Sequence, residues 1–99
     1  MTHRPLDTLN VKDWLGTAVL GSREQGRQLR QLLTAHIQDQ HAIRLDFQQV
    51  EVMTSAFADE CFGKLWASTA HTLLTQTIHL TGLTGNNHAI FRFVLAQRA

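Results

Sequence analysis

The 99-residue chain has one cysteine, one proline and no tyrosine, and two of its nine basic residues are lysines. A single cysteine, Cys61, excludes an internal disulfide and a cysteine-rich zinc site. Its position on the apolar face of a predicted helix favours a buried, unreactive thiol. The nine basic residues against eight acidic ones give a net charge of +1, and the arginines are scattered along the chain. Because nucleic-acid-binding proteins concentrate basic residues on one surface, we expect no nucleic-acid partner.

Long apolar runs are also missing. No stretch approaches the ~18 apolar residues of a membrane span, and the first residues, MTHRPLDTLNVKDW, lack the apolar centre of a signal peptide. We therefore expect a soluble, cytoplasmic protein with no membrane partner. The length and the 43% apolar content fit one domain over residues 1–99. Residues 1–10, which include Pro5, are predicted to be a loose lead-in.

The segment from Ile43 to Trp66 is the most informative part of the chain. Apolar residues alternate from Ile43 to Phe47, which predicts a strand, and Asp46 lies on its other face, where backbone donors could hold it. Thr54 and Ser55 then suit the start of a helix. The buried stripe of that helix has helical spacing and consists of Ala58, Cys61, Phe62 and Leu65.

The N-terminal half is predicted to contain one further helix. Residues 11–20 read as extended chain, either a hairpin or one strand kinked at Gly16. Ser22 and Gln25 have the spacing of a capping box, so a helix should begin there and run to about His36. Gly26 would allow close packing against this helix. Its predicted buried stripe consists of Leu29, Leu32, Leu33 and Ile37.

The C-terminal third should add a strand and a last helix. Residues 72–76 are ambiguous between a helical turn and a loop, whereas residues 77–81 alternate and are β-branched, which predicts a strand. After a loop over residues 82–86, Asn87 is predicted to cap a helix that begins at His88. The side chains expected to face inward are Ile90, Phe93 and Val94.

The resulting order is β, α, β, α, β, α. It predicts an α/β fold with a small, mostly parallel sheet of three to four strands and about three helices packed chiefly on one face. The loops that follow the strands should bring Ser22, Thr54–Ser55 and Asn86–Asn87 together at neighbouring helix starts. Ligands of open α/β sheets bind at that edge.

The central segment also carries a family resemblance. It resembles the bacterial STAS-like domain family of unknown function, whose pattern is L-D-F-x-x-V-E, a short gap, then F-A-D-E-x-F. The matching positions here are Leu45, Asp46, Phe47, Val50, Glu51, Phe57, Ala58, Asp59, Glu60 and Phe62. The Leu20–Arg23 stretch with Gly26, and Asn86–Asn87, are similar too. The resemblance covers roughly residues 11–98 and implies a small STAS-like sandwich.

More distantly, the family is similar to the STAS domains of anti-sigma-factor antagonists, which bind a kinase with an ATPase fold that phosphorylates them. Their phosphoacceptor is the second serine of a D-S-S element at a helix start. Here that element falls on Thr54, Ser55 and Ala56, so alanine occupies the acceptor position. The resemblance implies a module that binds a protein partner, such as a histidine-kinase-like ATPase.

The residues themselves supply no catalytic set. Asp59 and Glu60 are adjacent, so their side chains diverge on a helix and suit the positive helix start better than an acid/base pair. The six histidines show no metal-ligand spacing, and we expect them to be surface or satisfied side chains; His36 and His41 straddle a predicted helix end. We therefore expect no enzyme activity, no metal and no cofactor.

Three functions remain open. The first is a regulatory protein-interaction domain with a partner-binding surface at Thr54, Ser55, Phe57, Asp59 and Glu60. Phe57 is assigned to this surface because it falls off the predicted buried stripe, as do Trp66 and Phe91. The second is a phosphorylatable switch at Ser55 or Thr54, set against the simpler interpretation of Ser55 as a helix cap. The third is a small-ligand or anion site at the clustered helix starts.

Overall fold

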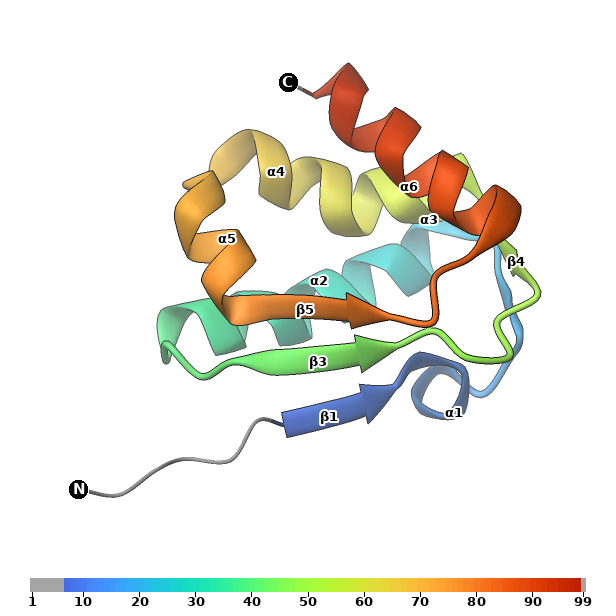
Figure 1. Cartoon of the computed structure of the whole chain (residues 1–99), viewed down its shortest axis with the longest axis horizontal. Helices are drawn as coiled ribbons and strands as arrows, with labels where there is room; N and C mark the ends of the chain where they lie inside the picture. The colour runs from blue at the N-terminus through green and yellow to red at the C-terminus, as the bar shows by residue number, and fades with distance from the viewer. Residues whose placement is uncertain (1–6, 99) are drawn as a thin grey trace.

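A three-stranded parallel sheet forms one side of the molecule in the computed structural model, which describes residues 7–98 (Figure 1). Strand β3 (Ile43–Asp46) lies between β1 (Asp7–Asn10) and β5 (Ile78–Thr81), and the register aligns Leu9, Leu45 and Leu80. The longer helices lie on one side of this sheet (Figure 1). The predicted fold class is therefore confirmed.

The two faces of the sheet differ as the alternation in β3 predicts. Ile43 and Leu45 are buried in the core under the helices, whereas Arg44 is exposed. Arg44 aligns with Thr8 on β1 and with His79 on β5, and both are exposed as well. The sheet thus buries one face and presents a polar face on the other side.

The N-terminal residues are more ordered than the sequence suggests. We predicted a loose lead-in over residues 1–10, which is wrong for Asp7–Asn10, because these residues form β1 and pair along their whole length with β3. Only Leu9 packs against the core from this strand, so its composition gives little sign of a strand. The other part of that prediction, residues 1–6, lies outside the described residues.

The prediction of extended chain over residues 11–20 is also wrong for its first half. Val11–Leu15 is a short helix, α1, which is followed by the two-residue strand β2 (Val19–Leu20). The Asn10 side chain accepts a hydrogen bond from the Asp13 backbone N–H at 2.9 Å and caps α1. Gly16 ends the helix with a φ of 74°, a left-handed conformation that favours glycine.

Helix α2 (Arg23–Gln38) begins with the predicted capping box of Ser22 and Gln25 and ends two residues later than predicted. Leu29 and Leu33 are fully buried, and Leu32 and Ile37 pack against the core at its edge. The prediction of close packing at Gly26 is confirmed. A Cβ added there would lie 2.7 Å from the backbone oxygen of Phe57.

The second helical segment runs without a break from Ser55 to Ser68. It consists of α3 (Ser55–Ala58), a π-helical turn η1 (Asp59–Gly63) and α4 (Lys64–Ser68). It follows strand β4 (Val52–Met53), which pairs in parallel with β2 as a separate two-stranded sheet. The predicted buried stripe is confirmed, because Ala58, Cys61, Phe62 and Leu65 all lie in the core.

The C-terminal third contains two helices. The ambiguous segment is helical, since α5 spans His71–Thr77 and leaves β5 to begin at Ile78. Helix α6 (Gly85–Gln97) begins before Asn87, so the predicted cap at Asn87 is wrong. Val94 is buried as predicted, but Phe93 is 59% exposed, which contradicts its assignment to the inner face. None of the helices over residues 7–98 combines the length and apolar character that a bilayer crossing requires.

Candidate functional site

Three helix starts meet beside the β2–β4 pair, as the sequence predicts. The Thr54 backbone N–H donates to the Leu20 carbonyl at 3.0 Å, and the Thr54 hydroxyl donates to the Gly21 carbonyl at 3.1 Å. The same hydroxyl accepts from the Phe57 backbone N–H at 3.2 Å and caps α3. The Thr54 side chain therefore joins the start of α3 to the chain that leads into α2.

Asn87 connects the start of α6 to the same place. Its side-chain oxygen accepts from the Met53 backbone N–H at 3.0 Å, and its side-chain nitrogen donates to the Val50 carbonyl at 3.2 Å. The amide group thus binds β4 at Met53 and the loop before β4 at Val50. Asn87 is part of the resemblance, but its role as a bridge depends on a contact across 34 residues that no local pattern indicates.

Ser55, one residue beyond the Thr54 cap, is exposed at the first turn of α3. It lies in a shallow depression of about 240 Å³ between α2, α3 and α6. Phe93, the most exposed aromatic ring of the described residues, lines this depression together with the partly exposed Arg23. We call this surface the docking depression; its lining residues are Arg23, Ser55, Ala56, Asp59, Phe93, Val94 and Gln97.

Phe57, by contrast, does not reach the surface. Its exposed fraction is 0%, so the prediction that it lies off the buried stripe is wrong. Its backbone lies where α3 packs against Gly26 of α2, and its side chain is part of the core. The other two off-stripe aromatic rings are partly buried: Trp66 stacks on His71 with ring centres 3.4 Å apart, and Phe91 meets Phe62 edge-on.

Glu60 is buried and ion-paired within the chain. Its carboxylate lies 2.7 Å from the Arg30 guanidinium, 2.8 Å from the Lys64 ammonium and 3.3 Å from the Arg23 guanidinium. The hydrogen bonds from Arg30 and Lys64 lower the pKa of Glu60 from 4.5 to about 2 against the opposing effect of its burial. A carboxylate held in this way joins α2 to the π-helical turn and carries no spare basicity for catalysis.

Asp59 is ion-paired chiefly with Arg98, near the end of α6. Arg98 donates two hydrogen bonds to its carboxylate, at 2.8 and 2.9 Å, and Arg23 approaches it to 3.3 Å. The Arg98 hydrogen bonds are the main reason why the pKa of Asp59 falls from 3.8 to about 2. The two acidic residues of the F-A-D-E motif have different main partners, Arg98 for Asp59 and Arg30 with Lys64 for Glu60, and Arg23 contacts both carboxylates.

Two further predictions, for Asp46 and Cys61, are confirmed, and one group of residues was not predicted. Asp46 accepts a hydrogen bond from the Gln48 backbone N–H at 2.9 Å, which confirms that a backbone donor holds it. Cys61 is fully buried, and burial raises the pKa of its thiol, as expected of an unreactive cysteine. The structure also brings His36 and His41 together with Asp7, an arrangement that the sequence reasoning missed.

Comparison with known families agrees with the resemblance. The model of a family described as a STAS-like domain of unknown function matches residues 25–88, which is well over half of the chain. No curated protein and no solved structure matches the chain. The matched range includes most of α2, all of β3, the capped start of α3, the F-A-D-E motif and β5. The chain therefore belongs to the family of STAS-like domains of unknown function.

Proposed function

We propose that this domain is a non-catalytic regulatory module that binds another protein through the docking depression. The observation that carries the proposal is Phe93, whose ring is 59% exposed in a hollow that it shares with Arg23 and Ser55. Exposed aromatic and arginine side chains that lie together are the residues that contribute most to protein–protein binding. The predicted surface therefore keeps Ser55 and Asp59, and Phe93 takes the place of Phe57.

The shape and chemistry of the depression favour a protein over a small ligand. Its volume of about 240 Å³ is below that of a typical small-molecule pocket. Anion binding at the starts of α2 and α3, which adjoin the depression, is disfavoured because side chains already cap these two starts. The Gln25 side chain accepts from the backbone N–H groups of Gly21 and Ser22, and Thr54 accepts from Phe57.

The partner class follows from the STAS resemblance. Antagonist STAS domains present the helix start after the central strand to a kinase with an ATPase fold, and in this chain the corresponding start, at Thr54–Ser55, adjoins the docking depression. We therefore propose a histidine-kinase-like ATPase as the partner. Arg23 suits an acidic group on that protein, because its side chain remains 57% exposed despite its ion pairs.

The proposal is tested by calorimetric titration with the histidine-kinase-like ATPase encoded nearest to this domain. Phe93→Ala should weaken binding at least about tenfold, since aromatic side chains at interface centres contribute more than 1 kcal/mol. Trp14→Ala is the matched control, because Trp14 is a 42% exposed aromatic on α1 that does not line the depression. Equal affinity for the wild type and Phe93→Ala, with the fold verified by circular dichroism, would contradict the proposal.

A second candidate is phosphorylation of Ser55, favoured by the exposure of its side chain. The Thr54 hydroxyl is engaged in capping and bridging, so Ser55 is the better acceptor of the two. A phosphate there would lie in the depression that Arg23 and Asp59 both line, where the guanidinium attracts it and the carboxylate repels it. Intact-mass measurement after incubation with the kinase and ATP should show one added phosphate that Ser55→Ala removes. An unchanged wild-type mass would refute this candidate.

A further inference from the structure

Asp7, His36 and His41 meet where α2 ends and β1 begins. His36 Nε2 lies 3.3 Å and His41 Nε2 lies 3.4 Å from the same oxygen, Oδ2 of Asp7. All three potential ligand atoms lie within 4.8 Å of one another. We propose that these residues bind a divalent transition-metal ion, for which Zn²⁺ is the best match, and that the ion fixes β1 to the end of α2.

The end of α2 brings the two imidazoles together. The His41 backbone N–H donates to the His36 carbonyl at 2.9 Å, and the Gln40 N–H donates to the Ile37 carbonyl at 3.2 Å. Gln40 has a φ of 53°, so these bonds form a Schellman motif. Such a motif places the side chains of its first and sixth residues in contact, and that contact is usually apolar. Here it consists of two histidines whose ring centres are 5.5 Å apart.

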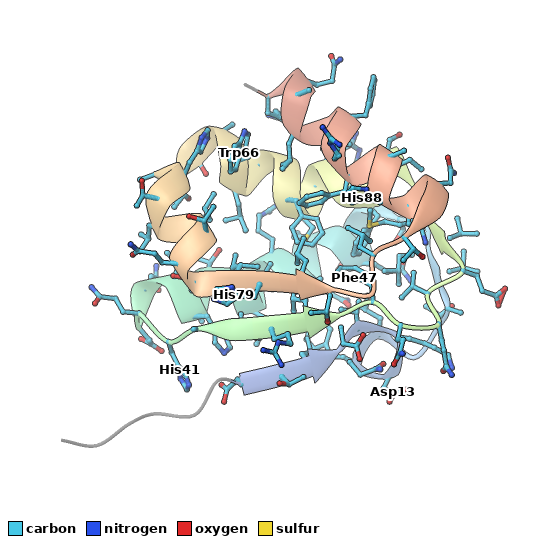
Figure 2. All side chains as sticks on the ribbon, viewed as in Figure 1. Asp13, His41, Phe47, Trp66, His79 and His88 are labelled. Carbon is cyan, nitrogen blue, oxygen red and sulfur yellow. The ribbon has the colours of Figure 1, made fainter. Side chains whose placement is uncertain are left out.

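The register of the sheet supplies the carboxylate. Asp7 pairs with Ile43, which is buried on the helix-covered face, so Asp7 begins β1 on the same face as α2. His41 lies in the loop between α2 and β3, next to the start of β1 (Figure 2). Three segments that are separate in the sequence therefore contribute one ligand each.

Hydrogen bonding leaves these nitrogens available as ligands. His36 Nδ1 lies 3.0 Å from the Leu32 carbonyl oxygen, which can only accept, so Nδ1 carries a proton. In the neutral ring Nε2 then holds the lone pair, and its 3.3 Å contact with Asp7 Oδ2 joins two acceptors. A carbonyl partner of this kind is the usual support for a metal-bound histidine. His41 Nε2 is buried and has no hydrogen-bond partner among residues 7–98. With both imidazoles neutral and their lone pairs on Nε2, three acceptor atoms face one another, an arrangement that a cation stabilises.

The spacing suits zinc. Ligands about 2.1 Å from a tetrahedral ion lie about 3.4 Å from each other, which matches the 3.3 and 3.4 Å separations from Asp7 to the two histidines. Two imidazoles and one carboxylate form a ligand set of zinc sites that keep a fourth position for water. The Asp7 side chain is 49% exposed, so water can reach that position.

The site is independent of the docking depression. His36 lies 13 residues beyond Arg23 on α2, which corresponds to about 20 Å along the helix. A negative result for metal binding would therefore leave the proposed partner surface standing, and a negative result for partner binding would leave the proposed metal site standing.

The test uses the full chain without an affinity tag and with His3→Ala, since His3 is a further imidazole close to Asp7 in the sequence. After removal of metals with a chelator, Zn²⁺ at pH 7.5 should raise the Tm by at least about 5 °C when it exceeds the Kd about 100-fold. Co²⁺ should give the visible absorption bands of a tetrahedral site. His36→Gln and His41→Gln should each weaken Zn²⁺ binding at least about tenfold.

His79→Gln is the matched control, because His79 is exposed on the open face of the sheet, and it should bind Zn²⁺ like the parent chain. The Co²⁺ spectrum of the parent chain keeps the proposal falsifiable even if a histidine variant fails to fold. Absence of both the Tm gain and the Co²⁺ bands would overturn the proposal. Folded His36→Gln and His41→Gln variants that bind Zn²⁺ as tightly as His79→Gln would do the same.

Discussion

Replacing Glu60 with glutamine should destabilise the domain strongly although the change is nearly isosteric. The variant leaves Arg30 and Lys64 beside a neutral amide at a site where the wild-type side chain is 9% exposed. The fall of the Glu60 pKa from 4.5 to about 2 corresponds to about 3 kcal/mol. Because Lys64 and Arg23 are partly solvated, which weakens their share of the interaction, we expect a loss of about 2 kcal/mol in the free energy of unfolding at pH 7.

The pH dependence of the free energy of unfolding tests this prediction further. The folded-state pKa of Glu60 is depressed, so its contribution to stability is complete above the unfolded pKa of 4.5 and is lost as the pH falls toward about 2. Urea unfolding of the wild type and Glu60→Gln should therefore differ most at pH 7 and progressively less from pH 5 to pH 2. Glu24→Gln, which removes an exposed partner of Arg27, should change the free energy of unfolding far less than Glu60→Gln does. A Glu60→Gln variant as stable as the wild type at pH 7 would refute the reasoning.

Three further predictions concern packing and connection. Gly26→Ala should lower the free energy of unfolding by about 2 kcal/mol in urea titrations, because the new Cβ would approach the Phe57 backbone oxygen to 2.7 Å. This crowding outweighs the gain in helix propensity of about 1 kcal/mol. A variant more stable than the wild type would refute the prediction. Asn87→Ala should cost about 1–2 kcal/mol because its bonds to Met53 and Val50 are lost. A similar loss for the exposed neighbour Asn86→Ala would argue against a specific bridge. The Cys61 thiol should react with an aromatic disulfide reagent in denaturant but not in the folded protein, since the side chain is fully buried. Rapid reaction of the folded protein with the reagent would contradict this burial.

Sequence patterns predicted those parts of the fold that depend on local chemistry. The capping box at Ser22 and the alternation in β3 are short-range signals that the structure confirms. Of Thr54 and Ser55, the two residues suited to cap the next helix, Thr54 is the cap and the assignment of that role to Ser55 is wrong. Two short elements escaped prediction. Strand β1 depends on pairing with β3, 36 residues away in the sequence, and α1 depends on a single cap at Asn10.

The candidate site was predicted less completely, because exposure on a helix depends on what packs against it. Phe57 was expected on the surface and Phe93 inside, and their positions are reversed. For Phe57 the decisive feature is α2, whose Gly26 lets α3 approach closely enough to bury the ring. The Asp7–His36–His41 group was missed because its ligands come from three segments, although a helix end between two histidines was a usable signal.

The docking depression is tested most directly by amide chemical shifts of the ¹⁵N-labelled domain during titration with the ATPase partner. The proposal predicts that the largest changes occur at Arg23, Ser55 and Phe93, with little change along α1. Changes confined to α1 and β1, or an unchanged spectrum at saturating partner concentration, would contradict it.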